Sequence, residues 1–252
     1  MTAPVLPAGW TVAAFDTIGS TNDEAAARAL AGAPEGTVVT ARRQEDGRGR
    51  RGRRWESPEG NAYSSTILRP ACRPDRAAQL GFAVALAVAD TAVAGLPTTR
   101  EIRLKWPNDV LIDGAKVAGI LLESEMGADG NVAHVVVGVG INVEAGPAVT
   151  AGGYPAAALR ALGDGRTVAE LLGAYIAALA ARVAQWRAGF AGTRADWLAR
   201  AAWLGDTVEV TVGTERLSGR FAGLDDDGAL LLQPPLGAAR RIVAGEVFRP
   251  SA

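Results

Sequence analysis

The residues best suited to chemistry in this chain are its two lysines, Lys105 and Lys116, which share the block KWPNDVLIDGAKVAGILLE. The other 24 cationic side chains are arginines. A chain that otherwise uses arginine is expected to keep lysine where a compact, strongly hydrated point charge fits and a wide planar guanidinium does not. A site close to a phosphate or a carboxylate has that requirement. The alternative for Lys116 is a surface strand position, but its small neighbours Ala115, Ala118 and Gly119 favour a site.

An arginine- and glycine-rich segment, GRGRRGRRW, occupies residues 47–55. Glycine lets the backbone wrap closely around a ligand, and arginine binds phosphate and carboxylate oxygens, bidentately where the geometry permits. Together with the lysines, this segment predicts a polyanionic small-molecule substrate. A solvated loop is one alternative, and a DNA minor-groove contact of the GRGR type is another. Because the arginines repel one another, we expect residues 46–55 to be mobile until a ligand supplies counter-charge. Trp55 either stacks on a base or anchors the core.

Two further motifs could complete such a site. In KWPND, Pro107 interrupts strand pairing, so that Asn108 and Asp109 form a turn. Asp109 could hold Mg²⁺ or a ribose hydroxyl, and an ordinary turn is the alternative. GVGIN, at residues 138–142, lacks the third glycine and the following helix of a dinucleotide fingerprint, which excludes a Rossmann site. Its glycines either let a ligand approach the strand, within reach of Asn142, or serve close strand packing.

Composition narrows the function classes. A net charge of −1 gives no general attraction to nucleic acid or to anionic membranes. The single Cys72 excludes an intramolecular disulfide and a cysteine-based zinc site, and the single His134 argues against a catalytic triad or a histidine-based metal site. The first ten residues do not read as a secretory signal, and the apolar run at 83–96 is too short to span a bilayer. We therefore expect a cytoplasmic protein with no DNA or membrane partner.

The elements that must position these residues form an α+β domain, residues 1–202, followed by a small β-barrel domain, residues 203–252. Ser20 is expected to cap the first helix. Asp113 and Gly114 are expected to form a two-residue hairpin turn, which places Lys116 on the return strand. The expected helices are 20–32, 75–96, 167–189 and 193–201. The expected strands of the larger domain are 10–15, 37–43, 61–70, 101–107, 109–112, 116–123 and 132–143, with a loop at 144–165.

Taken in order, these motifs resemble those of the biotin–protein ligases over residues 10–250. The matching blocks are STN at 20–22, Gln44, GRGRRGRRW, KWPND, KVAGILLE at 116–123 and GVGINV at 138–143. The resemblance implies a catalytic fold shared with class II aminoacyl-tRNA synthetases, with a mixed, mostly antiparallel sheet, and a C-terminal SH3-like domain. It implies that biotin and MgATP first give biotinyl-AMP, and that a lysine of a biotin carboxyl carrier domain then attacks. With no DNA-binding module before the first strand, it implies the non-regulatory subclass.

The resemblance also implies residue roles. Lys116, Arg48 and Arg50 are expected to act in catalysis. The implied biotin-binding residues are Ser20, Thr21, Asn22, Gln44, Arg48, Gly49, Arg50, Lys116 and Gly119. The implied nucleotide-binding residues are Arg48, Arg51, Arg53, Trp55, Lys105, Asn108, Asp109, Lys116, Gly138, Gly140 and Asn142, with Asp109 a candidate ligand of Mg²⁺. No prosthetic group is implied, and a monomer or weak homodimer is expected. A lipoyl–protein ligase of the same fold and a nucleic-acid-binding protein remain alternatives.

Overall fold

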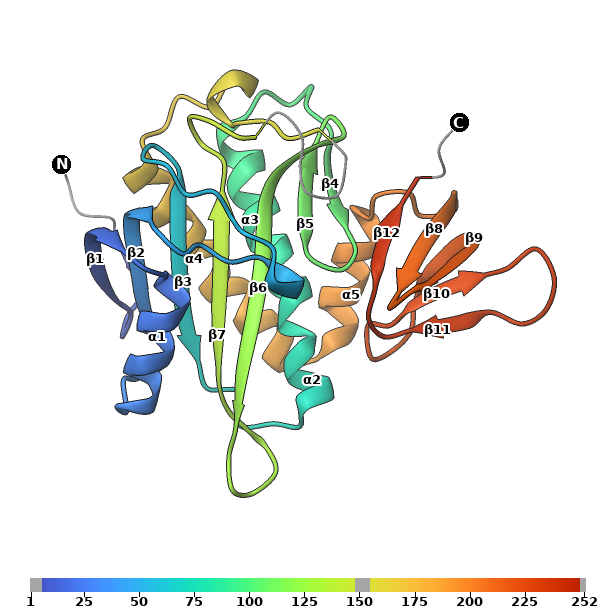
Figure 1. Cartoon of the computed structure of the whole chain (residues 1–252), viewed down its shortest axis with the longest axis horizontal. Helices are drawn as coiled ribbons and strands as arrows, with labels where there is room; N and C mark the ends of the chain where they lie inside the picture. Colours follow the sequence, from blue (N-terminus) through green and yellow to red (C-terminus); the bar gives the residue numbers. More distant parts are fainter. Residues whose placement is uncertain (1–5, 148–154, 250–252) are drawn as a thin grey trace.

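One mixed sheet carries most of the predicted residues. The computed structural model describes residues 6–147 and 155–249, and within them seven strands pair in the order β1-β2-β3-β7-β6-β5-β4 (Figure 1). Only β1 and β2 pair in parallel; the other neighbours are antiparallel, which confirms the expected sheet. The strands are β1 (Thr11–Ile18), β2 (Thr37–Gln44), β3 (Ala62–Leu68), β4 (Ile102–Lys105), β5 (Asp109–Ile112), β6 (Ala115–Met126) and β7 (Val132–Ile141).

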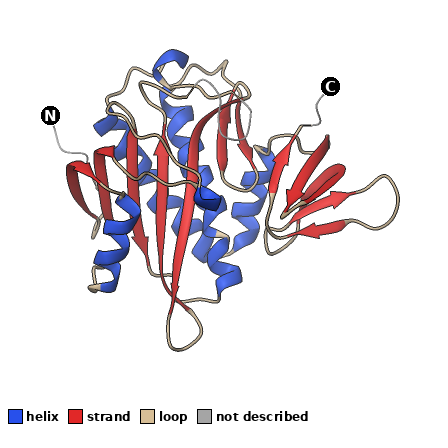
Figure 2. Cartoon of the chain, viewed as in Figure 1, coloured by secondary structure: helices blue, strands red, loops and turns tan. Residues whose placement is uncertain are grey.

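Helices cover the two faces of this sheet unequally (Figures 1 and 2). Helix α1 (Thr21–Leu30) packs on one face against β2, β3 and β7. The opposite face is covered by α2 (Pro74–Ala78), α3 (Leu80–Gly95), α4 (Val168–Ala188) and α5 (Phe190–Ala199). Burying apolar side chains of α3 between the sheet and α4 builds the main core. The face that carries α1 keeps room for a site.

The structure corrects two expectations about the segment Pro74–Gly95, which contains α2 and α3. The predicted helix at 75–96 is broken at Gln79, where α2 ends and α3 begins. By length and apolarity alone, Pro74–Gly95 is long enough to cross a membrane, and so is Val168–Ala188. However, 78% of the apolar window in Pro74–Gly95 is buried inside the protein, as in the core helix of a globular domain. Apolarity all around α3 is explained by this burial.

Of the local predictions near the site, the hairpin turn and the break at Pro107 are confirmed and the helix cap is wrong. Asp113 and Gly114 both have positive φ, 50° and 80°, as a type I′ turn requires, so the predicted hairpin between β5 and β6 is confirmed. Pro107, after a cis peptide bond, separates β4 from β5 as expected. Ser20 makes no capping hydrogen bond with its side chain. Instead Gln44, at the end of β2, accepts a hydrogen bond from the Thr21 amide at 2.9 Å.

The C-terminal part forms a separate antiparallel sheet with the strand order β11-β10-β9-β8-β12 (Figure 1). Its strands are β8 (Thr207–Val212), β9 (Glu215–Leu224), β10 (Leu230–Gln233), β11 (Arg240–Ile242) and β12 (Glu246–Phe248). The indole Nε1 of Trp106, next to the β4–β5 turn, donates to the Gly228 carbonyl oxygen at 3.4 Å. The small sheet is therefore docked beside the motif KWPND. The domain boundary at 202/203 stays a prediction.

Candidate active site

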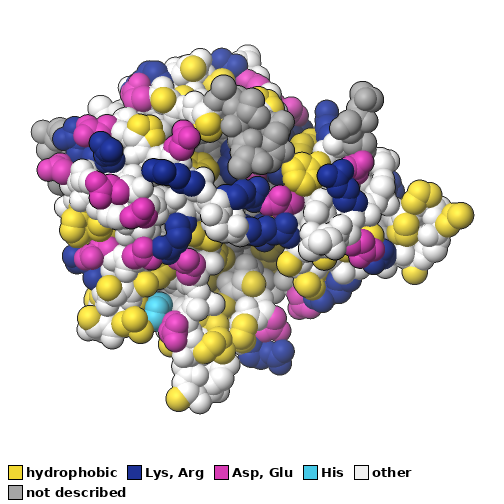
Figure 3. Space-filling model, in the orientation of Figure 1, with side chains coloured by type: hydrophobic (Ala, Val, Ile, Leu, Met, Phe, Trp, Pro, Cys, Tyr) yellow, Lys and Arg dark blue, Asp and Glu magenta, His cyan; other side chains and the backbone are white. Residues whose placement is uncertain are grey.

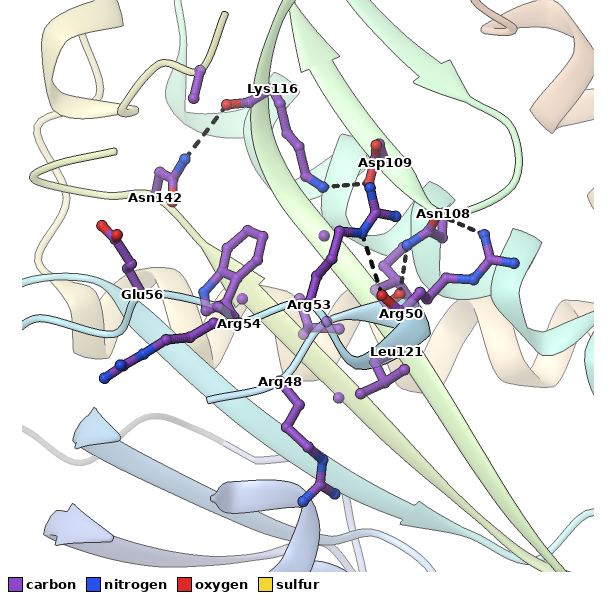
Figure 4. A pocket seen from close by; sticks show the side chains of 18 of the residues that line it. Arg48, Arg50, Arg53, Arg54, Glu56, Asn108, Asp109, Lys116, Leu121 and Asn142 are labelled. Carbon is purple, nitrogen blue, oxygen red and sulfur yellow. Dashed lines mark hydrogen bonds and ion pairs between the residues drawn. The ribbon is translucent and has the colours of Figure 1, made fainter. Parts of the chain in front are cut away.

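A cavity of about 230 Å³ opens on the sheet face that carries α1 (Figure 4). Lys and Arg side chains gather near the middle of this face, with acidic side chains among them (Figure 3). All the residues predicted for the two substrate sites except Arg51 line the cavity. They are Ser20, Thr21, Asn22, Gln44, Arg48, Gly49, Arg50, Arg53, Trp55, Lys105, Asn108, Asp109, Lys116, Gly119, Gly138, Gly140 and Asn142.

Arg51 lies elsewhere. It is exposed, has a left-handed backbone with a φ of 59°, and lines a neighbouring cavity. The short 3₁₀ helix at Arg50–Gly52 turns successive side chains in different directions. As a result Arg50 contributes to the first cavity and Arg51 does not. A nucleotide-binding role for Arg51 finds no support in this arrangement.

The two lysines share one carboxylate. Lys116 Nζ lies 2.6 Å from Asp109 Oδ1, and Lys105 Nζ lies 3.5 Å from Asp109 Oδ2. The side chains of Lys105, Asp109 and Lys116 are only 5%, 8% and 14% exposed. Burial lowers the pKa of Lys105, and the neighbouring Lys116 lowers it further, whereas Asp109 and Glu246 oppose the change. The site therefore holds two compact cations close together, which suits two anionic groups that must approach each other.

Asp109 is positioned as a counter-ion. Each of its carboxylate oxygens lies within 4 Å of a lysine ammonium. In residues 6–147 and 155–249, no three His, Cys, Asp or Glu side chains cluster in a way that could hold a metal ion. Magnesium bound mainly by substrate phosphates needs only one or two protein carboxylates. The prediction of Asp109 as a magnesium ligand therefore stays open.

Acidic partners offset part of the positive charge of the Arg-Gly segment. Arg48 forms an ion pair with Asp23 at 2.7 Å and a longer one with Glu123 at 3.3 Å. The Asp23 carboxylate raises the pKa of Arg48. In Figure 4 its guanidinium points away from Lys116, toward the α1 side of the cavity. Carboxylates of the protein thus offset part of the repulsion from which a mobile segment was expected, and the mobility of residues 46–55 stays a prediction.

Arg50 and Arg53 face the β4–β5 turn and the C-terminal domain. Arg50 Nη1 donates to Asn108 Oδ1 at 3.1 Å, and burial lowers the pKa of this guanidinium. Arg53 forms an ion pair with Glu246 of β12. These contacts fix the segment at the cationic end of the cavity.

Trp55 occupies space that two glycines leave open. A Cβ on Gly140 would lie 2.5 Å from the indole, and one on Gly119 would lie 2.9 Å from it. Lys116 Nζ lies 5.3 Å from the centre of a Trp55 ring, within the range of a cation–π contact. The glycines of GVGIN thus admit side chains close to the strand: Gly138 does the same for Asn22. Trp55 Nε1 is buried and finds no hydrogen-bond partner among the described residues, so a ligand acceptor would satisfy it.

The other end of the cavity is neutral and polar. Hydroxyl and amide side chains of Thr21, Asn22, Gln44 and the buried Ser65 are hydrogen-bonded to one another there. Such groups suit an uncharged, planar polar group. The cavity therefore has one neutral hydrogen-bonding end and one cationic end.

Asn142 supports the cavity wall. Its Nδ2 donates to the carbonyl oxygens of Ala157, at 3.2 Å, and Lys116, at 3.4 Å. The Lys116 amide in turn donates to the Pro155 carbonyl oxygen at 2.8 Å. Asn142 thus ties residues 155–157 to the start of β6, although it was expected to contact a nucleotide directly. That direct contact stays a prediction.

The sequence analysis did not single out several side chains that contact the predicted site residues, among them Ser65, Glu123, Glu246 and Phe248. Glu123 could have been found, because strand alternation places it on the same side of β6 as Gly119 and Leu121, which line the cavity. Glu246 and Phe248 come from the C-terminal domain, and no local signal links them to the site. Phe248 packs over Lys105, whose Nζ is 5.1 Å from the ring centre.

Two protein-family models match this chain. Residues 14–142 match the model described as the biotin/lipoate A/B protein ligase family, and residues 204–249 match the biotin protein ligase C-terminal domain. The chain belongs to the biotin/lipoate A/B protein ligase family. This membership, with the relatives below, confirms the resemblance to biotin protein ligases that the ordered motifs indicated.

The chain is similar to these relatives over most of their length. A biotin–[acetyl-CoA-carboxylase] ligase of Paracoccus denitrificans is 42% identical, over 91% of this chain and 96% of the relative. A ligase of the same name from Mycobacterium tuberculosis is 37% identical, over 85% and 80%. The solved biotin protein ligase of Aquifex aeolicus, in complex with biotin and ATP, superimposes with a TM-score of 0.77 at 26% identity and covers 94% of this chain and 97% of its own.

Proposed function

We propose that this biotin ligase activates biotin with MgATP to biotinyl-5′-AMP and then transfers the biotinyl group to a lysine of a biotin carboxyl carrier domain. One observation carries the proposal: a single cavity with a neutral hydrogen-bonding end and a cationic end built on Lys116, Asp109 and Lys105. The Paracoccus and Mycobacterium relatives are named for ligation to acetyl-CoA carboxylase. We infer a carrier domain of such a carboxylase as the acceptor, and a cytoplasmic location where ATP is available.

The two ends of the cavity suit the two substrates. The ureido group of biotin needs hydroxyl and amide partners, which Thr21, Asn22 and Gln44 offer. Its carboxylate would then extend toward Lys116, where the α-phosphate of ATP must meet it. Lys116 and Lys105 offset the repulsion between the two anions and stabilise the charge that develops at phosphorus. We assign Trp55 and Asn108 to the nucleotide, and Arg50 and Arg53 to its phosphates.

Both steps balance without an enzyme nucleophile. In the first step, a biotin carboxylate oxygen forms a bond to the α-phosphorus, and the bond from that phosphorus to pyrophosphate breaks. In the second, the acceptor amine attacks the acyl carbon, AMP leaves, and the amine loses a proton. Magnesium enters with ATP and neutralises phosphate charge. The enzyme contributes positions, charges and exclusion of water.

The neighbouring cavity offers a route for the acceptor. Its volume is about 640 Å³, and it lies between α2 and the turns of the C-terminal domain. Arg50, Asn108 and Ile120 line both cavities, so the two adjoin at the cationic end. We propose that the acceptor lysine reaches the adenylate from this side.

The decisive experiment is exchange of labelled pyrophosphate into ATP, with biotin or lipoate as the acid and no carrier present. Biotin-dependent exchange is expected because the adenylate forms before the acceptor is needed. Exchange with lipoate alone would favour the lipoyl ligase alternative, and pyrophosphate release or exchange that appears only after carrier addition would exclude the two-step mechanism. Nucleic-acid binding is the weaker alternative, because a net charge of −1 gives the protein no general attraction to a phosphate backbone.

Phe248→Ala is expected to raise the KM for ATP roughly two- to tenfold and to leave the KM for biotin unchanged. The ring shields Lys105, which we assign to nucleotide binding, and its loss would expose that ammonium to water. The exchange assay, with each substrate varied in turn, measures both constants. Leu236→Ala is the matched control, because Leu236 is 90% exposed in the same domain. An equal change in both constants would contradict a role confined to the nucleotide end.

A further inference from the structure

A continuous line of hydrogen bonds runs under the neutral end of the cavity and starts at Glu123. Glu123 Oε2 accepts from Asn22 Nδ2 at 2.6 Å, and Asn22 Oδ1 accepts from Ser65 Oγ at 2.5 Å. Ser65 Oγ lies 2.8 Å from Thr21 Oγ1, which lies 2.9 Å from Gln44 Oε1. Asn22, Ser65 and Thr21 are all buried. The line thus joins β6, α1, β3 and β2 beneath the cavity.

The direction of these hydrogen bonds is set by Glu123. An ionised carboxylate only accepts, so the NH₂ group of Asn22 must face it and the amide oxygen must face Ser65. Ser65 then uses its one hydrogen on Asn22. The single hydrogen of Thr21 is used on either Ser65 or Gln44, so Thr21 can only accept from a ligand. A carboxylate on β6 therefore determines which end of the Asn22 amide faces Ser65.

The Asn22 amide packs closely against β7. A Cβ on Gly138 would lie 2.2 Å from Asn22 Oδ1, so the amide is pressed against the backbone of β7. Only rotation of the amide by a half-turn would fit, and the Glu123 carboxylate opposes that rotation. The orientation of this amide thus depends on one distant side chain.

The same carboxylate also holds the Arg-Gly segment. Arg48 Nη2 lies 3.3 Å from both oxygens of Glu123, while its other contact is Asp23. One side chain therefore joins the floor of the cavity to the segment that closes over it. Glu123 is 41% exposed, so it is the position at which the line of hydrogen bonds meets solvent.

We propose that Glu123 is a positioning residue for the acyl substrate: it fixes the Asn22 amide with its oxygen toward Ser65 and anchors the Arg-Gly segment through Arg48. This inference rests on the proposed placement of biotin at the neutral end. It makes biotin recognition dependent on a residue that does not line the cavity itself.

Glu123→Gln tests the proposal. A glutamine lacks the charge that pairs with Arg48, and its NH₂ group can turn toward the NH₂ group of Asn22, so it no longer fixes the orientation of that amide. The KM for biotin in the exchange assay, and the Kd from calorimetry without ATP, are expected to rise about tenfold or more. The KM for ATP and the melting temperature are expected to stay near those of the unmodified enzyme. Glu125→Gln is the matched control, because Glu125 is exposed on the same strand and makes the same change of charge.

The double variant Asn22→Asp with Glu123→Gln separates orientation from general stability. The new amide on β6 would then donate and the new carboxylate on α1 would accept, so an oxygen would again face Ser65 and the net charge would be unchanged. Biotin affinity is expected to recover relative to Glu123→Gln alone. No recovery, unchanged biotin affinity in Glu123→Gln, or a parallel loss of biotin affinity, ATP affinity and melting temperature would overturn the proposal. Exchange by the unmodified enzyme in the same assay reports separately on the proposed function.

Discussion

Replacing Lys116 by arginine is expected to slow formation of biotinyl-AMP by about 10²–10³-fold, nearly as much as replacing it by alanine. The ammonium sits between Asp109 and Trp55, and Lys116 Cε and Nζ would be 3.3 Å from a Cβ on Gly119. A planar guanidinium is too wide for this space, so it would keep the charge but lose its position. Single-turnover formation of biotinyl-AMP, with both substrates saturating, measures the effect.

Lys105→Ala is the comparison for Lys116. Lys105 lies farther from Asp109 and under Phe248, so its loss is expected to weaken ATP binding more than it slows the chemical step. Near-normal adenylate formation by Lys116→Arg would show that charge alone suffices, and would remove the argument from the rarity of lysine.

Asp109→Ala is expected to destabilise the protein by about 3–5 kcal/mol, because it leaves two largely buried ammonium groups without their shared carboxylate. Urea unfolding of the ligand-free protein in EDTA measures this loss. Asp226→Ala, which removes a pair whose acidic side chain is 96% exposed, is the control and is expected to have little effect. If Asp109 acts chiefly as a magnesium ligand, the loss in EDTA would be small and activity would return at high magnesium.

The same variant has a predictable dependence on pH. Burial already lowers the pKa of Lys105, and Asp109 opposes that change, so Asp109→Ala should lower this pKa further. Between the folded and unfolded pKa values the unfolded chain binds more protons, so the free energy of unfolding rises with pH. The penalty is therefore largest below the folded pKa of Lys105 and disappears above its unfolded value, near ~10.4. Part of the lost stability should therefore return as the pH rises toward the unfolded value of ~10.4.

The sequence predicted those features of this enzyme that depend only on residues close together in the chain. The turn at Asp113 and Gly114 needs only its own two residues, and the order of the motifs was enough to indicate the family. Capping of α1 was mispredicted because the acceptor, Gln44, comes from a different strand and outcompetes the neighbouring Ser20. Backbone hydrogen bonds at a helix start can be satisfied from anywhere in space, so sequence proximity is a poor guide there.

The charge balance of the Arg-Gly segment could not be predicted from the sequence for the same reason, because its acidic partners are distant in the chain. The closely spaced arginines predict repulsion, but their partners Asp23, Glu123 and Glu246 are spread over the rest of the chain. Net charge near zero gave a hint that balancing acids exist, yet not where they lie. Strand alternation could have located Glu123, whereas the docking of β12 has no signature in the residues themselves.

The position of Glu246 and Phe248 has a consequence for biosynthesis. These two residues leave the ribosome well after the rest of the site, and they reach it only when the small C-terminal sheet has folded and docked. A nascent or truncated chain that ends before residue 203 would carry the biotin end of the cavity but an uncovered Lys105. Adenylation by such a fragment would lack the shielding that keeps a reactive anhydride from water. Because Lys105 is assigned to nucleotide binding, a chain interrupted before β12 is expected to bind ATP weakly and to form little adenylate.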